Sequence, residues 1–159
     1  MARPKPTLYM LVGPNGAGKS TFYETVIAPI IKAPWINADQ IQRYELQDTT
    51  MQAAYSAAKI AEQRRRFYLA HQQSMISEST FSHPSKLTLI KEAKQAGFRI
   101  MLYHICVRSP NLSVARVAER VKEGGHPVPE TKIRSRYVRN QNLIQHAAHY
   151  ADKAFIYDN

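Results

Sequence analysis

A glycine-rich segment near the N-terminus carries the clearest chemical signal in the sequence. Residues 13–21 read GPNGAGKST and match the phosphate-binding pattern G-x-x-x-x-G-K-[ST], the P-loop. The glycines let the backbone curl around a phosphate and point its N–H groups inward. Lys19 would reach the β- and γ-phosphates of ATP, and Ser20 would place a hydroxyl on Mg²⁺. The residues predicted to bind the nucleotide are Gly13, Pro14, Asn15, Gly16, Ala17, Gly18, Lys19, Ser20 and Thr21.

An aspartate follows the second expected strand, in the segment WINADQIQR. Ligands of an open parallel sheet lie beyond the carboxyl ends of its strands, so Asp39 is expected to face the γ-phosphate. It could then accept the proton of an acceptor hydroxyl as that oxygen attacks phosphorus. An alternative is that Asp39 caps a helix beginning near Gln40. Arg43, four residues later, is a candidate contact for an anionic acceptor.

A glutamate closes the third expected strand, in the segment MISESTFS. Glu78 could hold a water on Mg²⁺ or contact the acceptor, with the hydroxyls of Thr80 and Ser82 beside it. Ser20 and Glu78 are therefore the predicted metal-site residues, and Thr80 joins Asp39, Arg43 and Glu78 as a predicted acceptor contact. The alternative is that a neighbouring serine, 79 or 82, caps the next helix and that Glu78 has no role.

Basic residues gather between positions 116 and 139, where Gly124, Gly125, Pro127 and Pro129 separate two helical segments. This arrangement predicts a lid at about residues 112–140 that closes over phosphates and excludes water. Arginines in such a lid would stabilise the charge that develops on the transferred phosphoryl group. The alternative is a solvated basic face. The basic residues are Arg116, Arg120, Lys122, His126, Lys132, Arg134, Arg136 and Arg139.

Within this segment Arg120 is the first catalytic candidate and Arg136 the second, while Arg134 and His126 stay open for the second position. The predicted catalytic set is therefore Asp39 and Lys19 with these two arginines. A further run, Arg64–Arg66, lies in an expected helix. Its three consecutive residues point around the helix, so a solvated surface is expected there rather than a nucleic-acid site.

Alternating strand-like and helix-like segments would position these residues. Apolar runs predict five strands, and the segments between them predict helices, so the sequence indicates an α/β protein with the P-loop NTPase fold. We expect a mainly parallel five-stranded sheet with helices on both faces, formed by one domain over residues 1–159. The expected strands are 7–12, 34–37, 74–77, 98–107 and 153–157, and the expected helices are 19–27, 48–71, 84–95, 112–122 and 130–148.

The amino-acid composition limits the kinds of partner that the protein is expected to bind. The chain of 159 residues has a formal net charge of +10, which attracts anions such as nucleotides, phosphorylated metabolites or nucleic acid. It contains one cysteine, so a reducing cytoplasmic setting is expected and an intramolecular disulfide is excluded. No segment has the length of apolar residues that a membrane span needs, and no signal peptide is expected. No motif that reads DNA or RNA accompanies the charge, so nucleic acid is not the expected partner.

Taken together, the motifs resemble those of the zeta toxin family of P-loop kinases. The resemblance rests on GPNGAGKST at 13–21, INAD at 36–39, ESTFS at 78–82 and RVAERVKEGGHPVPETKIRSRY at 116–137, and it extends to FIYDN at 155–159. It implies an ATP-dependent, Mg²⁺-dependent kinase that phosphorylates a sugar hydroxyl of a UDP-N-acetyl amino sugar, typically UDP-N-acetylglucosamine. It also implies that an antitoxin protein is a candidate partner.

The resemblance implies roles for single residues as well. Lys19 and Ser20 would handle ATP and Mg²⁺, Asp39 matches the general base, Glu78 matches the acid of the third strand, and Arg120 matches a phosphate-clamping arginine. Two alternatives stay open. One is a kinase of another acceptor, such as a nucleoside or a polynucleotide end, and the other is a non-catalytic nucleotide-binding module that acts through a partner.

Overall fold

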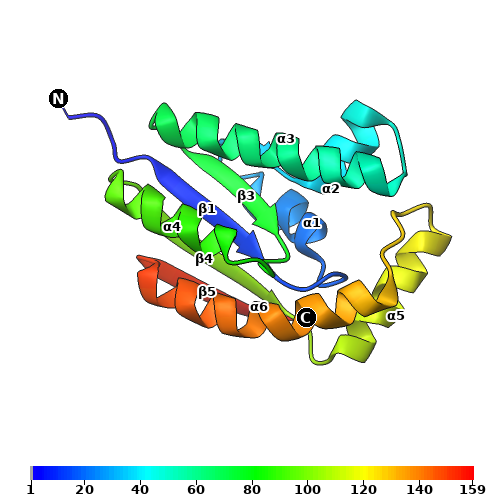
Figure 1. The fold of residues 1–159 in the computed structure, drawn as a ribbon. Coiled ribbons are helices and arrows are strands. Elements are labelled where there is room, and N and C mark those ends of the chain that lie inside the picture. Colours follow the sequence, from blue (N-terminus) through cyan, green and yellow to red (C-terminus); the bar gives the residue numbers. More distant parts are fainter. Residues whose placement is uncertain (1) are drawn as a thin grey trace.

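Five strands, each parallel to its neighbours, form a single sheet at the centre of the structure, a computed structural model that describes residues 2–159 (Figure 1). Their order across the sheet is β2-β3-β1-β4-β5, so the strand that leads into the P-loop lies in the middle. The predicted five-stranded parallel sheet is confirmed. The strands are β1 (Thr7–Val12), β2 (Trp35–Ile36), β3 (Met75–Ser79), β4 (Arg99–Cys106) and β5 (Lys153–Asp158).

Helices cover both faces of this sheet, as the sequence predicts (Figure 1). The α-helices are α1 (Lys19–Phe22), α2 (Ala38–Gln40), α3 (Met51–Ala70), α4 (Ser85–Gln95), α5 (Pro110–Lys122) and α6 (Glu130–Tyr150). Two π-helical segments continue the first two of them, η1 (Tyr23–Ile27) and η2 (Ile41–Leu46). Among the described residues, no helix combines the length and the apolar character needed to cross a membrane.

The alternation of side chains along β1 divides the core into two parts. Leu8, Met10 and Val12 point to one face, where they pack with buried residues of α3, α4 and α6. Leu11 points to the other face and packs with Ile27 at the end of η1. Because both faces of the central strand are largely buried, β1 is apolar over most of its length after Thr7, as expected of a strand inside a parallel sheet.

Some expectations were wrong in detail. The helix expected over 48–71 begins at Met51, because Asp48 accepts a hydrogen bond from the Thr50 N–H in a turn and the Thr50 hydroxyl caps α3. The strand expected over 74–77, with Glu78 at its end, runs from Met75 to Ser79, so Glu78 is its penultimate residue. β5 is an edge strand whose residues are all exposed.

Candidate active site

The P-loop connects the end of β1 to the start of α1. Gly18 precedes the helix with φ of 90°, a left-handed conformation that glycine adopts at no steric cost. Gly13 serves a different purpose, because a Cβ there would lie 2.3 Å from the carbonyl oxygen of Ile105 in β4. Its lack of a side chain lets the loop leave the sheet close to the neighbouring strand. The predicted strand, loop and helix are thus in place, with the N-terminus of α1 facing the loop's interior.

The side chain of Lys19 lies over the loop that carries it. Its Nζ donates hydrogen bonds to the carbonyl oxygens of Gly13, at 2.9 Å, and Pro14, at 3.0 Å. Burial lowers the pKa of Lys19, an effect that the negative charges of Glu78 and Asp39 oppose. A phosphate in the loop would add negative charge beside this ammonium and further favour its charged form.

Glu78 and Ser20 meet beside the loop. The Ser20 hydroxyl donates to Oε1 of Glu78 at 3.4 Å, and the indole Nε1 of Trp35 donates to Oε2 at 3.0 Å. Burial raises the pKa of Glu78, and the charge of Lys19 opposes this shift. A hydroxyl and a carboxylate are the hard oxygen donors that Mg²⁺ takes alongside substrate phosphates, so these two residues fit such an ion. Sequence reasoning missed Trp35, the single tryptophan of the chain.

Asp39 lines the same cavity as Lys19 and Glu78, on the short helix that follows β2. The alternative role expected for Asp39, a helix cap, was wrong. Asn37 caps α2, because its Oδ1 accepts from the N–H groups of Asp39, at 2.8 Å, and Gln40, at 3.4 Å. Asn37 has the extended backbone of a cap residue, whereas Asp39 is inside the helix with an exposed side chain. Asp39 is therefore not the cap residue of α2, and its exposed side chain lines the cavity.

The segment predicted to act as a lid comprises α5, the connection at residues 123–129 and the first turns of α6. Arg120, His126 and Arg136 line the cavity. Burial lowers the pKa of Arg136, while the charge of Asp39 acts in the opposite direction. Arg134 does not line the cavity, because it pairs with Glu130 at 3.0 Å and donates to Asn111 at 2.8 Å. Of the open choices for the second lid residue, the structure brings Arg136 and His126 into the site.

The loop after β3 has an unusual backbone. Phe81 is fully buried with φ of 56°, a left-handed conformation that is strained for a residue with a side chain. The hydroxyl of Ser79 accepts from the Phe81 N–H at 3.1 Å, and the Asn140 amide of α6 donates to the Thr80 carbonyl at 3.1 Å. This turn presents Thr80 and Ser82 to the cavity. Neither Ser79 nor Ser82 caps α4, since Pro84 occupies that position.

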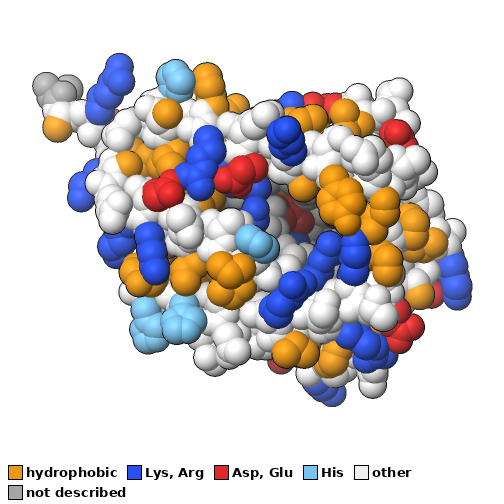
Figure 2. All heavy atoms as spheres, in the orientation of Figure 1, with side chains coloured by type: hydrophobic (Ala, Val, Ile, Leu, Met, Phe, Trp, Pro, Cys, Tyr) orange, Lys and Arg blue, Asp and Glu red, His pale blue; other side chains and the backbone are white. Residues whose placement is uncertain are grey.

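These residues surround one cavity of about 340 Å³. Figure 2 shows it as a hollow with acidic side chains inside and basic side chains around it. Asn15–Ser20 of the P-loop line it, whereas Thr21 lies beside a shallower hollow with Arg116. Arg43 lies outside it, exposed, with its guanidinium 5.4 Å from the ring centre of Tyr44. The structure thus brings together all the predicted catalytic residues and separates Arg43 from them.

The cavity is also lined by two basic residues that we did not expect there from the sequence. Arg65, expected on a solvated surface, has 3% of its surface exposed and lines the cavity together with Lys86 of α4. The expectation was wrong for Arg65, because α3 turns one residue of the arginine run inward. A signal was present in the sequence, since Arg65 continues the buried stripe of Ala53, Ala57 and Ala61 at a spacing of four residues.

The family model described as Zeta toxin matches residues 1–158. An uncharacterized protein of Haemophilus influenzae is 32% identical over 130 residues, which cover 79% of this chain and 88% of that protein. A structure from the PezAT chromosomal toxin-antitoxin system of Streptococcus pneumoniae has a TM-score of 0.71 at 19% identity, and the match covers 100% of this chain and 70% of that one.

A chain of the AvrRxo1-ORF1:-ORF2 complex with ATP also has a TM-score of 0.71, at 18% identity, with 91% of this chain and 50% of that chain covered. The present chain therefore spans half the length of that structural neighbour. The two structural likenesses show a shared fold. The family match extends over nearly all of the sequence, including the P-loop, both acids and the lid. The chain belongs to the zeta toxin family and is a P-loop kinase.

Proposed function

We propose that this kinase transfers the γ-phosphoryl group of ATP to a hydroxyl of a UDP-N-acetyl amino sugar such as UDP-N-acetylglucosamine. The observation that carries the proposal is that Asp39 and Lys19, which lie on different elements, line one cavity. A carboxylate that faces a phosphate-binding lysine is the arrangement that phosphoryl transfer to an alcohol requires. The resemblance in the INAD and ESTFS segments suggests the class of sugar.

The nucleotide half of the cavity would hold ATP through backbone N–H groups within residues 15–18 and through Lys19. Ser20 and Glu78 would hold Mg²⁺, which neutralises charge on the phosphates. Trp35 fixes the Glu78 carboxylate through its indole N–H and so keeps one oxygen directed toward Ser20. These residues bind and orient the donor and do not themselves exchange protons with it.

In the transfer step, Asp39 accepts the proton of the acceptor hydroxyl while the oxygen forms a bond to the γ-phosphorus. The bond from this phosphorus to the β-phosphate oxygen breaks, and ADP leaves. Arg120 and Arg136 reach the same cavity from the lid and stabilise the charge on the transferred group. Closure of the lid excludes water, which would otherwise compete with the sugar as the acceptor.

An antitoxin partner and a cytoplasmic setting belong to the same proposal. The family match and the PezAT neighbour, which comes from a toxin-antitoxin system, support the partner. The single cysteine of the chain is in keeping with the setting.

The deciding experiment incubates the protein with MgATP and a panel of UDP-sugars, nucleosides and polynucleotide ends, and reads phosphorylated products by mass. We expect UDP-N-acetylglucosamine to gain one phosphoryl group. Asp39→Asn should lower this turnover by about 10³-fold and leave MgATP affinity unchanged. Arg43→Gln is the matched control, because Arg43 lies nearby outside the cavity. Phosphorylation of a nucleoside or polynucleotide instead would replace the proposed acceptor, and MgATP binding without any product would favour a non-catalytic module.

A further inference from the structure

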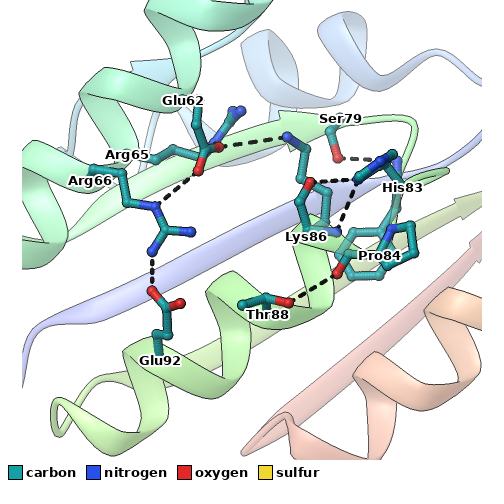
Figure 3. A network of polar contacts seen from close by, with 11 residues as sticks. Glu62, Arg65, Arg66, Ser79, His83, Pro84, Lys86, Thr88 and Glu92 are labelled. Carbon is teal, nitrogen blue, oxygen red and sulfur yellow. Dashed lines mark hydrogen bonds and ion pairs between the residues drawn. The ribbon is translucent and has the colours of Figure 1, made fainter.

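Two cations on facing helices line the cavity away from the P-loop. Arg65 extends from α3 and Lys86 from α4, and both are directed to the same carboxylate, that of Glu62 (Figure 3). Arg65 Nε donates to Glu62 Oε2 at 3.1 Å, and Lys86 Nζ lies 3.9 Å from the same oxygen. The other oxygen of Glu62 accepts from Arg66 at 2.9 Å, and Arg66 also pairs with Glu92. One carboxylate oxygen is therefore shared by the two cations that face the cavity.

Because two cations share one carboxylate oxygen, part of their positive charge is not balanced. Burial makes such unbalanced charge costly. The side chain of Arg65 is 4% exposed and that of Lys86 is 18% exposed. Within residues 2–159, the hydrogen bond to Glu62 is the one that the Arg65 side chain makes, and it uses Nε. The terminal nitrogens of Arg65 therefore keep donors for another group. Burial, with the charge of Arg65, also lowers the pKa of Lys86 to about 8, as expected for an ammonium short of counter-charge.

Arg65 and Lys86 reach the cavity from other elements than the residues expected to bind the nucleotide. Lys19, Arg120 and Arg136 reach the cavity from α1 and the lid and would face the phosphates of ATP. Arg65 and Lys86 reach it from α3 and α4, on the side where Thr80 and Ser82 follow β3. The cavity thus has two groups of cations. The donor needs the first group, and the second group is left for the acceptor.

We propose that Arg65 and Lys86 form a subsite for a phosphate group carried by the acceptor, so that this kinase selects phosphate or diphosphate esters over free sugars. The inference rests on the proposed function and names the part of the acceptor that is recognised. A phosphate takes two hydrogen bonds from a guanidinium and a third from an ammonium, and it supplies the charge that Glu62 alone does not. A neutral hydroxyl compound would leave both cations without this charge.

Kinetics with matched acceptors test the subsite. The probes are N-acetylglucosamine, N-acetylglucosamine 1-phosphate and UDP-N-acetylglucosamine, each with saturating MgATP. In the wild-type protein we expect a KM at least tenfold lower for the two phosphate-bearing compounds. Lys86→Gln should raise the KM for those two compounds by about tenfold or more and remove most of the preference. Lys91→Gln is the matched control, because Lys91 lies on the same helix, exposed, over the ring of Tyr150.

A binding measurement separates failure of the subsite from failure of the proposed function. UDP-N-acetylglucosamine is titrated calorimetrically into protein saturated with Mg²⁺ and β,γ-methylene-ATP. Binding that depends on Lys86, without turnover of any acceptor, would keep the subsite and end the proposed transfer reaction. Equal affinity in wild-type protein and Lys86→Gln would overturn the subsite and leave the pair as a packing contact between α3 and α4. Arg65→Gln, accepted only if its thermal unfolding stays cooperative, should repeat the Lys86→Gln result.

Discussion

The two halves of the cavity recognise phosphate by different means. The nucleotide half is built largely from backbone, because the P-loop presents N–H groups and even Lys19 is held by the loop carbonyls of Gly13 and Pro14. The acceptor half is built from side chains of separate helices, and its cations share one carboxylate. Few substitutions can alter a backbone cradle without destroying it, whereas one substitution in α3 or α4 changes the other half. We therefore expect proteins of this fold to share the way they bind ATP and to differ in the acceptor they bind.

The substitution expected to separate the two halves of the cavity most clearly is Lys19→Met. Lys19 is the cation placed to bridge the β- and γ-phosphates, so we expect this change to lower kcat/KM by about 10³-fold or more and to weaken MgATP binding. Calorimetric titration with MgATP and steady-state kinetics measure both effects. Lys86→Gln tests the other half and should leave MgATP affinity unchanged. Equal loss of MgATP affinity in the two variants would show that the halves are not distinct.

The lid arginines allow a second test inside the nucleotide half. Arg136→Gln should lower kcat by about 10²-fold, because its guanidinium reaches the cavity and would stabilise developing charge. Arg134→Gln is the matched control on the same helix, since Arg134 pairs with Glu130 and Asn111 instead. Steady-state kinetics at saturating MgATP give the comparison. A larger loss in Arg134→Gln would mean that the lid rotates on closure.

Trp35 tests how the metal-site carboxylate is held. Trp35→Phe keeps a ring to stack on Tyr23, whose centre lies 3.8 Å away, but removes the donor to Glu78 Oε2. Without this hydrogen bond the pKa of Glu78, already raised by burial, should rise further. Mg²⁺ needs the ionised carboxylate, so the acid limb of the pH-rate profile should move to higher pH, with Mg²⁺ affinity about tenfold weaker at neutral pH. An unchanged acid limb would exclude Trp35 from this role.

The smallest expected effect concerns stability. The pKa of Lys86 is about 8 in the folded protein, whereas the ordinary pKa of a lysine, 10.5, applies in the unfolded chain. Between these values the unfolded chain holds a proton that the folded chain has released, so the wild-type free energy of unfolding should rise with pH relative to Lys86→Met. The shift sets an upper limit of about 3 kcal/mol, and solvent at the ammonium reduces the expected difference to roughly 1 kcal/mol. Urea unfolding at pH 7.5 and pH 10 measures it, and a parallel pH dependence of both proteins would contradict it.

The sequence predicted the site best where function depends on residues that are consecutive along the chain. The P-loop and β1 could be placed to the residue, because a buried strand, three glycines, a lysine and a serine must be consecutive to cradle phosphate. The acids Asp39 and Glu78 could be placed because parallel strands end at a common edge of the sheet. These predictions needed no knowledge of which helices face each other.

The remaining errors depend on three-dimensional packing. Asn37 and Asp39 are both good cap residues, and the extended backbone at Asn37, which the sequence does not specify, decides between them. The burial of Arg65 depends on the approach of α4, which brings Lys86 to the inner side of α3, where Glu62 of α3 is shared by the two cations. The left-handed turn at Phe81 is held partly by Asn140 from α6, some 60 residues away.

The place of β2 in the sheet bears on how the site opens. β2 contributes two residues, Trp35 and Ile36, and pairs on one side only, with β3, whereas β1 is paired along its length on both sides. Amide hydrogen exchange should consequently be fast around Asp39 and slow through β1, because local unfolding begins where the fewest interstrand bonds must break. We expect Asp39, the proposed proton acceptor, to lie on a segment that fluctuates independently, and the P-loop to unfold only with the domain as a whole. We therefore expect each turnover to admit and release the acceptor while the nucleotide stays bound.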